Sequence, residues 1–436
     1  MKVFIFLFVS LILLAYDTDA RRTSHMLTGT YNISKATPNP FTGAVYSCLM
    51  VQAGARFGTN GDEWMIGFDS SETDENMRHH LIAYGIHFSS SLLQEGNVLE
   101  NVEDGDIIYD CSSITSSKSP PVKQLHTEQV GNVPLDFLSM FNDNNSTTPA
   151  SGGYKYGMPI GARTEVVLWA IEMHIHVDMF EPDAQVPIKI HVKGTTDAPD
   201  NDVLGLVMYG VNPPFPGFAK ELLMNIPINS DGQYTITSGS RPAAPFCNSY
   251  VYPDAVECES CCPNYPFVYP NNWFELRMEQ SDLPYVDLIS SHLHYHHLGV
   301  SAVGSIVSLD GSETLVDAQF NHENALHALS QPLRLTSTDG LKMKCTYERH
   351  GNMTNNIIGG YTTSEEMCLG FSYYTAPVGV PFFHPGLLYG DICNTVQNEG
   401  YANENDPMDD TLTYLGIPKQ YICRGSCAND PIGCPN

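Results

Sequence analysis

Short apolar runs separated by polar, turn-forming residues are the dominant pattern along this chain. Such runs, rich in β-branched and aromatic side chains, occupy residues 164–171, 186–192, 204–209 and 302–308, with Gly, Pro, Asn and Asp between them. The pattern predicts β-strands joined by turns. Helical periodicity is scarce, and we expect a short helix only at residues 323–330. The predicted fold class is therefore all-β, built from antiparallel sandwiches.

Changes in composition suggest how the chain is divided. The polar, turn-rich stretch 194–202 separates two strand-like segments, so we place the boundary between domains 21–197 and 198–380 there. The polar stretch 112–148 is typical of a long loop inside the first half. The last segment, 381–436, contains four cysteines and an acidic run. We expect it to be a disulfide-tied tail without a large core of its own.

Length and charge limit the classes of partner. A chain of 436 residues has room for about two to three domains. Its formal charge of −28, from 21 basic and 49 acidic residues, argues against nucleic acid and anionic membrane surfaces as partners. A small neutral or basic substrate suits that charge better.

The first 20 residues have the features of a secretory signal peptide. Lys2 provides the positive start, residues 3–15 are apolar, and Thr18 and Ala20 are small residues where a cleavage site needs them. A membrane anchor would need about 20 consecutive apolar residues, and no run in the chain is that long. We therefore expect a soluble, secreted protein with no transmembrane segment, cleaved after residue 20.

Cysteine usage agrees with export. The chain has 12 cysteines, an even number that is consistent with disulfides formed in an oxidising compartment. Cys48 and Cys111, which are alone in the first half, can pair with each other, although their spacing does not establish it. The spacing of Cys258, Cys261 and Cys262 suits zinc as well as disulfides, and export favours disulfides. Sequons for N-linked glycans begin at Asn32, Asn144, Asn145 and Asn352.

A histidine-rich stretch offers the first candidate chemistry. Four histidines lie within residues 292–297, between two apolar segments that are typical of buried strands. Because side chains alternate along a strand, His292, His294 and His296 project from one face. Imidazoles two positions apart on a strand lie about 7 Å from each other and can bind one metal ion. We interpret the stretch as a metal site rather than as a surface cluster of histidines.

Further candidate ligands lie elsewhere in the chain. The adjacent His79 and His80 would point to opposite faces of a strand, so they need a bulge or a strand end to reach one ion. His174 and His176 share a strand face, where histidines that bind no metal are an equally good interpretation. Met367 follows two carboxylates and precedes a cysteine, an unusual place for a core methionine. Imidazoles with a thioether form a soft ligand set that favours copper over zinc or iron.

Together these stretches resemble the copper type II, ascorbate-dependent monooxygenases, the family of dopamine β-monooxygenase and peptidylglycine α-hydroxylating monooxygenase. The similarity covers about residues 40–376 and is closer to the dopamine-type members. The His-His pair and the Glu-Met-His strand are similar to the family's first copper site, and the His-x-His-His-Leu-Gly and Glu-Glu-Met-Cys motifs to its second. The resemblance implies two copper ions per chain, the first held by His79, His80 and His174 and the second by His294, His296 and Met367.

The resemblance also implies a fold and a reaction. The fold is two tandem antiparallel, jelly-roll-like β-sandwiches, with one copper ion in each. The reaction is hydroxylation of a C–H bond of a small substrate by O₂, with ascorbate as the reductant. His294, His296 and Met367 would form the catalytic, oxygen-activating site, and the other copper would store and deliver an electron. Cys345 and Cys368 match a family disulfide.

Some positions depart from the family pattern. Ile86 stands where a cysteine commonly follows the His-His pair, so the disulfides of the first domain must differ. Peptide-amidating members have an arginine at the position of His292, and an asparagine and a tyrosine where this chain has Leu369 and Phe371. These differences argue against glycine-extended peptides as substrates. We expect His292 either to support the ligand imidazoles or to line the substrate pocket.

The residues that support the ligands and the alternatives to an enzyme complete the expectations from the sequence. Residues expected to support the ligand imidazoles from behind are Glu172, His176 and His297. The alternative to an enzyme is a non-catalytic secreted copper-binding or carbohydrate-binding β-sandwich protein, or a disulfide-rich protein whose histidines bind zinc. Neither the substrate nor the oligomeric state follows from the sequence.

Overall fold

The structure, a computed structural model, describes most of the two predicted domains. The described residues are 22–38, 45–58, 62–90, 93–94, 97, 99–111, 122–129, 134–141, 154–211, 233–239, 283–296, 298–308, 312–320, 325–336, 339–348, 366–383 and 395–396. Several predicted features lie outside them, namely the signal peptide, the 258–262 cysteines, His297, the sequons at Asn144, Asn145 and Asn352, and the tail apart from residues 381–383 and 395–396.

The first half of the chain is built from ten strands in its described part. They are β1 (Arg22–Asn32), β2 (Val45–Gln52), β3 (Trp64–Asp69), β4 (His80–His87), β5 (Ile107–Ile108), β6 (Val122–Gln129), β7 (Leu135–Asp136), β8 (Tyr156–Pro159), β9 (Val166–Ile175) and β10 (Gln185–Thr195). Two short helices, α2 (Ala53–Arg56) and α4 (Phe137–Phe141), accompany them.

The described part of the second half contains strands and no α-helix. The strands are β11 (Asn201–Val211), β12 (Gln233–Gly239), β13 (Tyr285–Tyr295), β14 (Gly299–Val307), β15 (Glu313–Phe320), β16 (His327–Thr336), β17 (Gly340–Glu348), β18 (Cys368–Thr375) and β19 (Thr395–Val396). The all-β, sandwich-like fold predicted from the pattern of apolar runs is confirmed.

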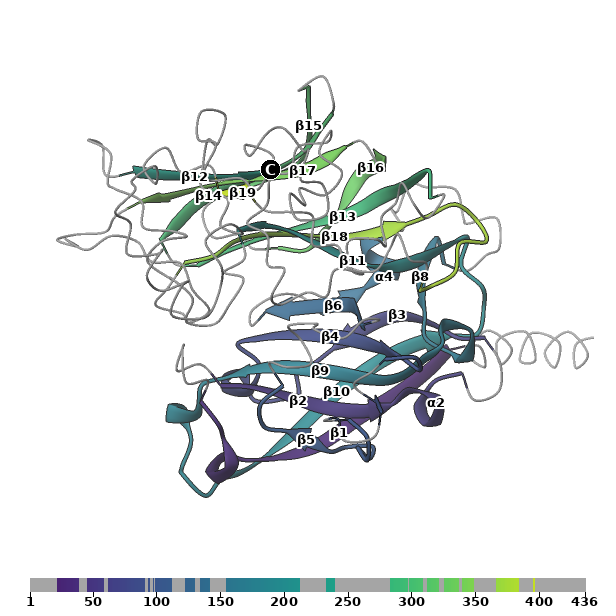
Figure 1. Cartoon of the computed structure of the whole chain (residues 1–436), viewed down its shortest axis with the longest axis vertical. Coiled ribbons are helices and arrows are strands. Elements are labelled where there is room, and N and C mark those ends of the chain that lie inside the picture. The colour runs from purple at the N-terminus through teal and green to yellow at the C-terminus, as the bar shows by residue number, and fades with distance from the viewer. Residues whose placement is uncertain are drawn as a thin grey trace, which may run out of the picture.

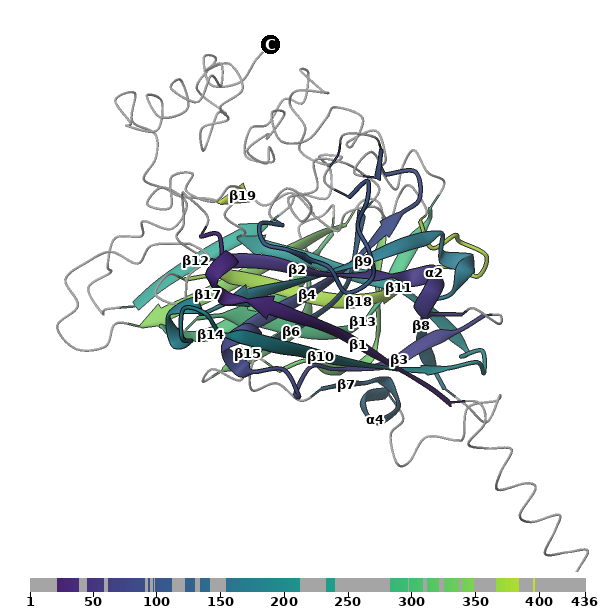
Figure 2. The same ribbon diagram turned by 90° about the horizontal axis from the view of Figure 1, so that it is seen from below.

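Among the described residues the strands form three sheets. One has the order β5-β2-β9-β4-β6, the second β15-β14-β17-β12-β19, and the third β1-β10-β3-β8-β11-β18-β13-β16 with β7 beside β3. Figure 1 shows the strands stacked in layers, with the first half below the second, and Figure 2 shows these strands overlapping when they are seen from below. The long sheet passes from one half to the other through the parallel pair β8 and β11. The two halves therefore share hydrogen-bonded backbone, and a division into domains at residue 197 stays a prediction.

Alternation of apolar and polar residues explains the outer strands, whereas the central strands are buried on both faces. In β10 the side chains of Val186, Ile188, Ile190 and Val192 are buried, and those between them are more exposed. Such alternation is expected of a strand with one face on the core. Every residue of β18 is buried, as are the last eight of β13. The histidine-rich end of β13 therefore lies inside the molecule.

Two predictions about secondary structure are wrong. The segment expected to form a helix at 323–330 contributes instead to β16, because Ser291 on β13 pairs with His327 and extends that sheet. The segment 112–148, expected to be a long loop, contains β6, β7 and α4. The strand β6 pairs with β4 along its whole length. In both places pairing with a distant strand decides the backbone conformation.

Two disulfides lie in the described part of the chain. Cys48 on β2 is bonded to Cys111, which confirms the pairing that the spacing allowed. Cys345 on β17 is bonded to Cys368, the first residue of β18, as the resemblance implied. The second disulfide joins the two facing sheets of the second half immediately beside Met367.

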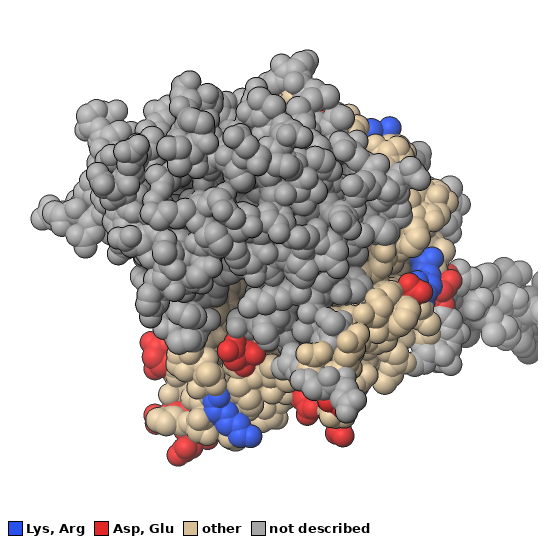
Figure 3. Space-filling view, in the orientation of Figure 1, with Lys and Arg blue, Asp and Glu red and all other residues tan. Residues whose placement is uncertain are grey.

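The described surface of the first half carries scattered charged side chains among mostly uncharged ones. Figure 3 shows Asp and Glu side chains at several places on this face, with fewer Lys and Arg side chains among them. This distribution agrees with the formal charge of −28. No helix in the described residues is both long and apolar enough to pass through a membrane.

Candidate metal centre

A strand end brings the adjacent histidines 79 and 80 to one side. A 3₁₀ turn, Glu75–Met77, ends at Arg78, and β4 begins only at His80. His79 therefore lies outside the regular alternation, and its backbone N–H donates to the carbonyl of His174 at 3.2 Å. This is the strand end that the sequence required for two neighbouring imidazoles to reach one ion.

His79, His80 and His174 form a compact cluster, which we call the first histidine group. Their ring centroids are 5.6 Å (79–80), 5.4 Å (79–174) and 4.7 Å (80–174) apart. One ring nitrogen from each lies within 4.8 Å of those of the other two, close enough for one metal ion to bind all three. Tyr46, opposite His174 in the sheet, stacks on its ring at 4.7 Å and limits its rotation.

A second cluster lies at the end of β13. The rings of His292 and His294 are 6.2 Å apart and those of His294 and His296 are 5.1 Å apart. The three imidazoles therefore form one row, as the alternation of side chains predicted. All three residues are buried.

The strand register places Met367 beside this row. Tyr295 pairs with Cys368 and His294 with Leu369, so Met367, which immediately precedes Cys368, stands next to the end of β13. Met367 is buried, and its carbonyl accepts a hydrogen bond from the Tyr347 hydroxyl. We call His294, His296 and Met367 the second group.

The two groups meet, although they come from opposite halves of the chain. The ring centroids of His79 and His296 are 6.5 Å apart, and those of His80 and His294 are 6.3 Å apart. Five imidazoles, three from the first half and two from the second, thus form one continuous cluster. The sequence predicted both sets but not their contact.

Burial makes the imidazoles of the cluster weak bases. Desolvation, followed by the neighbouring His176 and His296, lowers the pKa of His79 to about 4. Desolvation is also the largest cause of the low pKa of His80, His174 and His294, with neighbouring histidines adding to it. Neutral imidazoles present the lone pairs that metal binding requires, so the cluster is ready to bind a cation at neutral pH.

The residues present fit copper. The Nδ1 atoms of His80 and His174 are buried and have no hydrogen-bond partner among the described residues. Such atoms are costly to bury unless something binds them, and a metal ion would do so. The donors are imidazole nitrogens, with the thioether of Met367 next to the end of β13, and no described carboxylate completes the first group. This nitrogen and sulfur chemistry favours copper among the common biological metals.

Glu366 is a site residue whose role the sequence did not reveal. Its carboxyl group accepts hydrogen bonds from the backbone N–H of His296 at 3.1 Å and of Leu298 at 2.9 Å. It therefore fixes the turn that follows β13 and orients His296. Burial raises the pKa of Glu366 to about 8, although the two backbone N–H groups oppose the shift. The paired carboxylates before Met367 were the available signal, but nothing local shows what they bind.

We expect Glu366→Ala to destabilise the metal-free protein by about 2–4 kcal/mol, because two buried N–H groups lose their acceptor. Glu366→Gln keeps an acceptor and is expected to cost less than about 1 kcal/mol. Urea unfolding measures both values. Equal losses for the two variants would show that the carboxyl group does not hold the turn.

A comparison of wild type with Glu366→Gln also tests the pKa of Glu366. A carboxyl group whose pKa is 4.5 when unfolded and about 8 when folded binds more protons in the folded state between those values. The stability that it contributes is therefore fully present below pH 4.5 and is lost as pH rises through about 8. We expect the stability difference between wild type and Glu366→Gln to change over this window and to be constant outside it.

Other residues singled out in the sequence lie around the cluster. His176 is 4.8 Å from His79 and 5.4 Å from His174 between ring centroids, so it adjoins the first group without belonging to its set of close nitrogens. Glu172 is buried on β9, two residues before His174. The ring of His292 is 5.6 Å from that of Phe371. A supporting role for Glu172 and His176 stays a prediction.

Solved structures similar to this chain give no guide to its function. The "Structure of infectious bursal disease virus Gx strain" is 10% identical, covers 84% of this chain and 75% of its own, and has a TM-score of 0.15. The "Crystal structure of infectious bursal disease virus VP2 subviral particle" is 11% identical, with coverage of 84% and 74% and a TM-score of 0.15. These scores are too low to support a conclusion. A search of the curated proteins found no match.

A sequence-family model gives a more specific result. The model for "Copper type II ascorbate-dependent monooxygenase, C-terminal domain" matches residues 277–401. The matched region contains β13, β18 and all three residues of the second group. Residues 277–401 thus match the C-terminal domain of the copper type II ascorbate-dependent monooxygenases, and this match supports that family for the chain.

Proposed function

We propose that this protein is a secreted copper monooxygenase of the dopamine-type branch, which hydroxylates a C–H bond of a small amine with O₂ and ascorbate. The observation that carries the proposal is the contact between the first histidine group and the second group, with ring centroids 6.3 and 6.5 Å apart. It occurs in a chain whose second half matches the monooxygenase family.

The two groups have donors suited to different tasks. His79, His80 and His174 would hold one copper ion through three imidazoles. His294, His296 and Met367 would hold the other, and a thioether favours the reduced ion. When bound, copper supplies the activation of O₂ and the one-electron transfers that a monooxygenase needs. The contact between the groups makes the path for an electron short.

Other side chains prepare this centre. Burial of His174, His294, His296 and Met367 excludes water from the place where O₂ would react. The stacked ring of Tyr46 fixes the orientation of His174, and Glu366 fixes the backbone of His296. Both contacts hold ligands in place before any metal binds, which strengthens metal binding.

The substrate is proposed to approach along the row of histidines on β13. His292 and Phe371 lie side by side beyond His294, with ring centroids 5.6 Å apart, and they would line its pocket. The acidic chain favours a cation, so an amine is the proposed class.

The test is ascorbate-dependent O₂ uptake by copper-loaded protein. Phenylethylamine is expected to stimulate uptake and to yield a hydroxylated product, whereas a glycine-extended peptide is expected not to. Metal analysis is expected to find two copper ions per chain. Copper binding without substrate-stimulated uptake would favour a non-catalytic copper protein, and binding of zinc alone would contradict the copper assignment.

Secretion is part of the proposal. The two disulfides, Cys48–Cys111 and Cys345–Cys368, support folding in an oxidising compartment. Expression in a secretory host followed by N-terminal sequencing of the medium fraction is expected to give a chain that begins at Arg21. Glycosidase treatment would reveal glycans at the sequons.

A further inference from the structure

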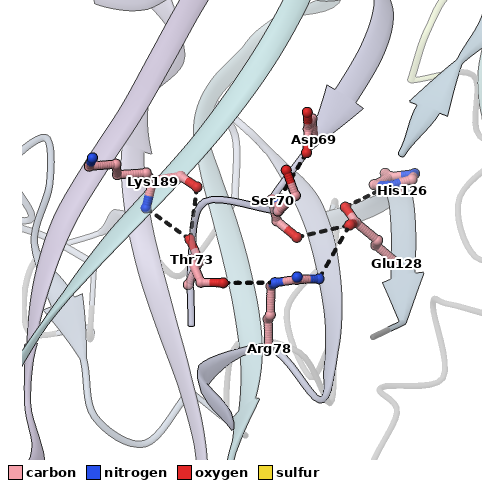
Figure 4. Close-up of polar contacts among 8 residues, drawn as sticks. Asp69, Ser70, Thr73, Arg78, His126, Glu128 and Lys189 are labelled. Carbon is pink, nitrogen blue, oxygen red and sulfur yellow. Dashed lines mark hydrogen bonds and ion pairs between the residues drawn. The ribbon is translucent and has the colours of Figure 1, made fainter. Parts of the chain in front are cut away.

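A buried ion pair lies next to the first histidine group, on the other face of its sheet. Arg78 immediately precedes His79, and its Nη1 lies 3.8 Å from Oε1 of Glu128 on β6. Only 14% of the Arg78 side chain and 4% of the Glu128 side chain are exposed. The same Oε1 accepts a hydrogen bond from the Ser70 hydroxyl at 2.9 Å. Figure 4 shows Arg78, Ser70 and His126 arranged around the Glu128 carboxylate.

Arg78 is also hydrogen-bonded to the loop that precedes the His79–His80 corner, where the chain enters β4. Its Nε donates to the carbonyl of Thr73 at 2.9 Å. Thr73 is in turn held on β10, because its hydroxyl donates to the carbonyl of Lys189 at 2.8 Å and accepts from the N–H of Lys189 at 2.9 Å. Arg78 thus links three parts of the first half: β6, the 70–77 loop and, through that loop, β10 (Figure 4).

The pairing of β4 with β6 shows where the Arg78–Glu128 pair lies relative to His79 and His80. His80 pairs with Gln129, and Leu81 pairs with Glu128. Side chains of directly paired residues lie on the same face, so Glu128 projects from the face opposite the His80 imidazole. His79 precedes β4, and its backbone N–H donates to the carbonyl of His174 on β9. The Arg78 side chain holds this corner from behind.

We propose that Arg78 and Glu128 are positioning residues that set the His79–His80 corner so that both imidazoles reach one metal ion. The inference rests on the proposed function, because it takes the first histidine group as a copper site. Stability alone is a poor reason for this ion pair, since a well-packed apolar pair often stabilises a buried site as much or more. A guanidinium that binds at two points provides the fixed orientation that an apolar pair lacks.

The same carboxylate reaches toward the second half. Glu128 Oε2 lies 3.9 Å from Nε2 of His126, and neither atom has a hydrogen-bond partner among the described residues. Nδ1 of His126 is hydrogen-bonded to the hydroxyl of Tyr373 on β18. Burial raises the pKa of Tyr373, which keeps the phenol protonated. The Arg78–Glu128 pair is therefore linked, through His126 and Tyr373, to β18, the strand that begins immediately after Met367.

Copper(II) titration tests the proposal on protein that carries His294→Ala and His296→Ala, so that only the first group can bind. We expect Glu128→Gln in this parent to weaken copper binding by about 10- to 100-fold and to change the hyperfine splitting of the copper EPR signal. Glu72→Gln is the matched control. It removes an equal charge from the 70–77 loop instead of from β6, and among the ion pairs described Glu72 contacts only Lys189 and His191 on β10. We expect it to change affinity by less than about twofold.

The outcomes separate this inference from the proposed function. A parent protein that binds no copper would contradict the first copper site itself. A parent that binds copper, with unchanged affinity and EPR spectrum in Glu128→Gln, would overturn the positioning role alone. Loss of a buried charge partner can impair folding, so Arg78→Lys provides a second variant. It retains the positive charge but loses the planar guanidinium that contacts both Thr73 and Glu128. It is expected to fold and to show the same change of EPR spectrum, and an unchanged spectrum would also overturn the proposal.

Discussion

Met367→Ala is expected to lower substrate-stimulated O₂ uptake by more than about 100-fold, while one copper ion per chain is retained. The reason is that the thioether belongs to the second group alone. Met367 immediately precedes Cys368, the strand partner of Tyr295, and the three close ring nitrogens of the first histidine group do not involve it. Oxygen-electrode rates and metal analysis on the same preparation measure the two quantities.

A matched variant separates ligation from packing. Met367 is buried, so its truncation to Ala also leaves a cavity beside the Cys345–Cys368 disulfide. Met367→Leu retains most of the volume and removes only the sulfur donor. We expect it to be as inactive as Met367→Ala and nearly as stable as wild type. Full activity of Met367→Leu, or loss of both copper ions in either variant, would contradict the assigned division between the two groups.

His174→Ala is expected to lower the copper content from two ions per chain to one, which abolishes turnover. His174 is the central member of the first histidine group, with ring centroids 4.7 Å from His80 and 5.4 Å from His79. Its removal leaves two imidazoles, too few to retain a copper ion against a chelator. The measurement is copper per chain after dialysis against that chelator.

His176→Ala is the matched control for this result. Its ring stacks on that of His174 at 5.4 Å and shares the same strand end, yet His176 is outside the set of three close nitrogens. We expect two copper ions per chain in this variant, with affinity at the first site lowered by about tenfold at most. Two ions in His174→Ala together with one in His176→Ala would exchange the roles of these two histidines.

The strand β6 shows where sequence patterns fail. Its buried positions include Lys123, His126 and Glu128, residue types that normally face water. Their burial is possible because distant segments provide hydrogen-bond partners. The Phe382 carbonyl accepts a hydrogen bond from Lys123, the Tyr373 hydroxyl is hydrogen-bonded to His126, and the Ser70 hydroxyl donates to Glu128. No window of the sequence around residues 122–129 contains these partners, so the segment has the composition of a loop.

The histidines near the candidate metal centre show the opposite case. Histidine at alternating positions is recognisable locally, because the alternation of side chains along a strand is a property of the backbone itself. The row His292, His294, His296 formed as this rule predicted. The adjacent His79 and His80 required a strand end, and β4 begins at His80. Local backbone geometry was therefore sufficient to predict the histidine row on β13 and the strand end at His79 and His80.

The sequence by itself determined the all-β class and the row of histidines at alternating positions, because these depend on backbone periodicity. The spacing only allowed the Cys48–Cys111 pair, and the resemblance to the monooxygenase family implied the Cys345–Cys368 pair and the two sets of candidate ligands. Only the tertiary structure decided that the two sets touch, with His79 and His80 within 6.5 Å of His296 and His294. It also decided that Glu366 holds the turn after β13 and that Arg78 and Glu128 hold the His79–His80 corner. These contacts join residues that are 50 to more than 200 positions apart. The pairing of β4 with β6 brings Glu128 near Arg78, and the pairing of β13 with β18 brings Glu366 near His296. The contact between the two histidine sets arises where the two halves of the chain pack together.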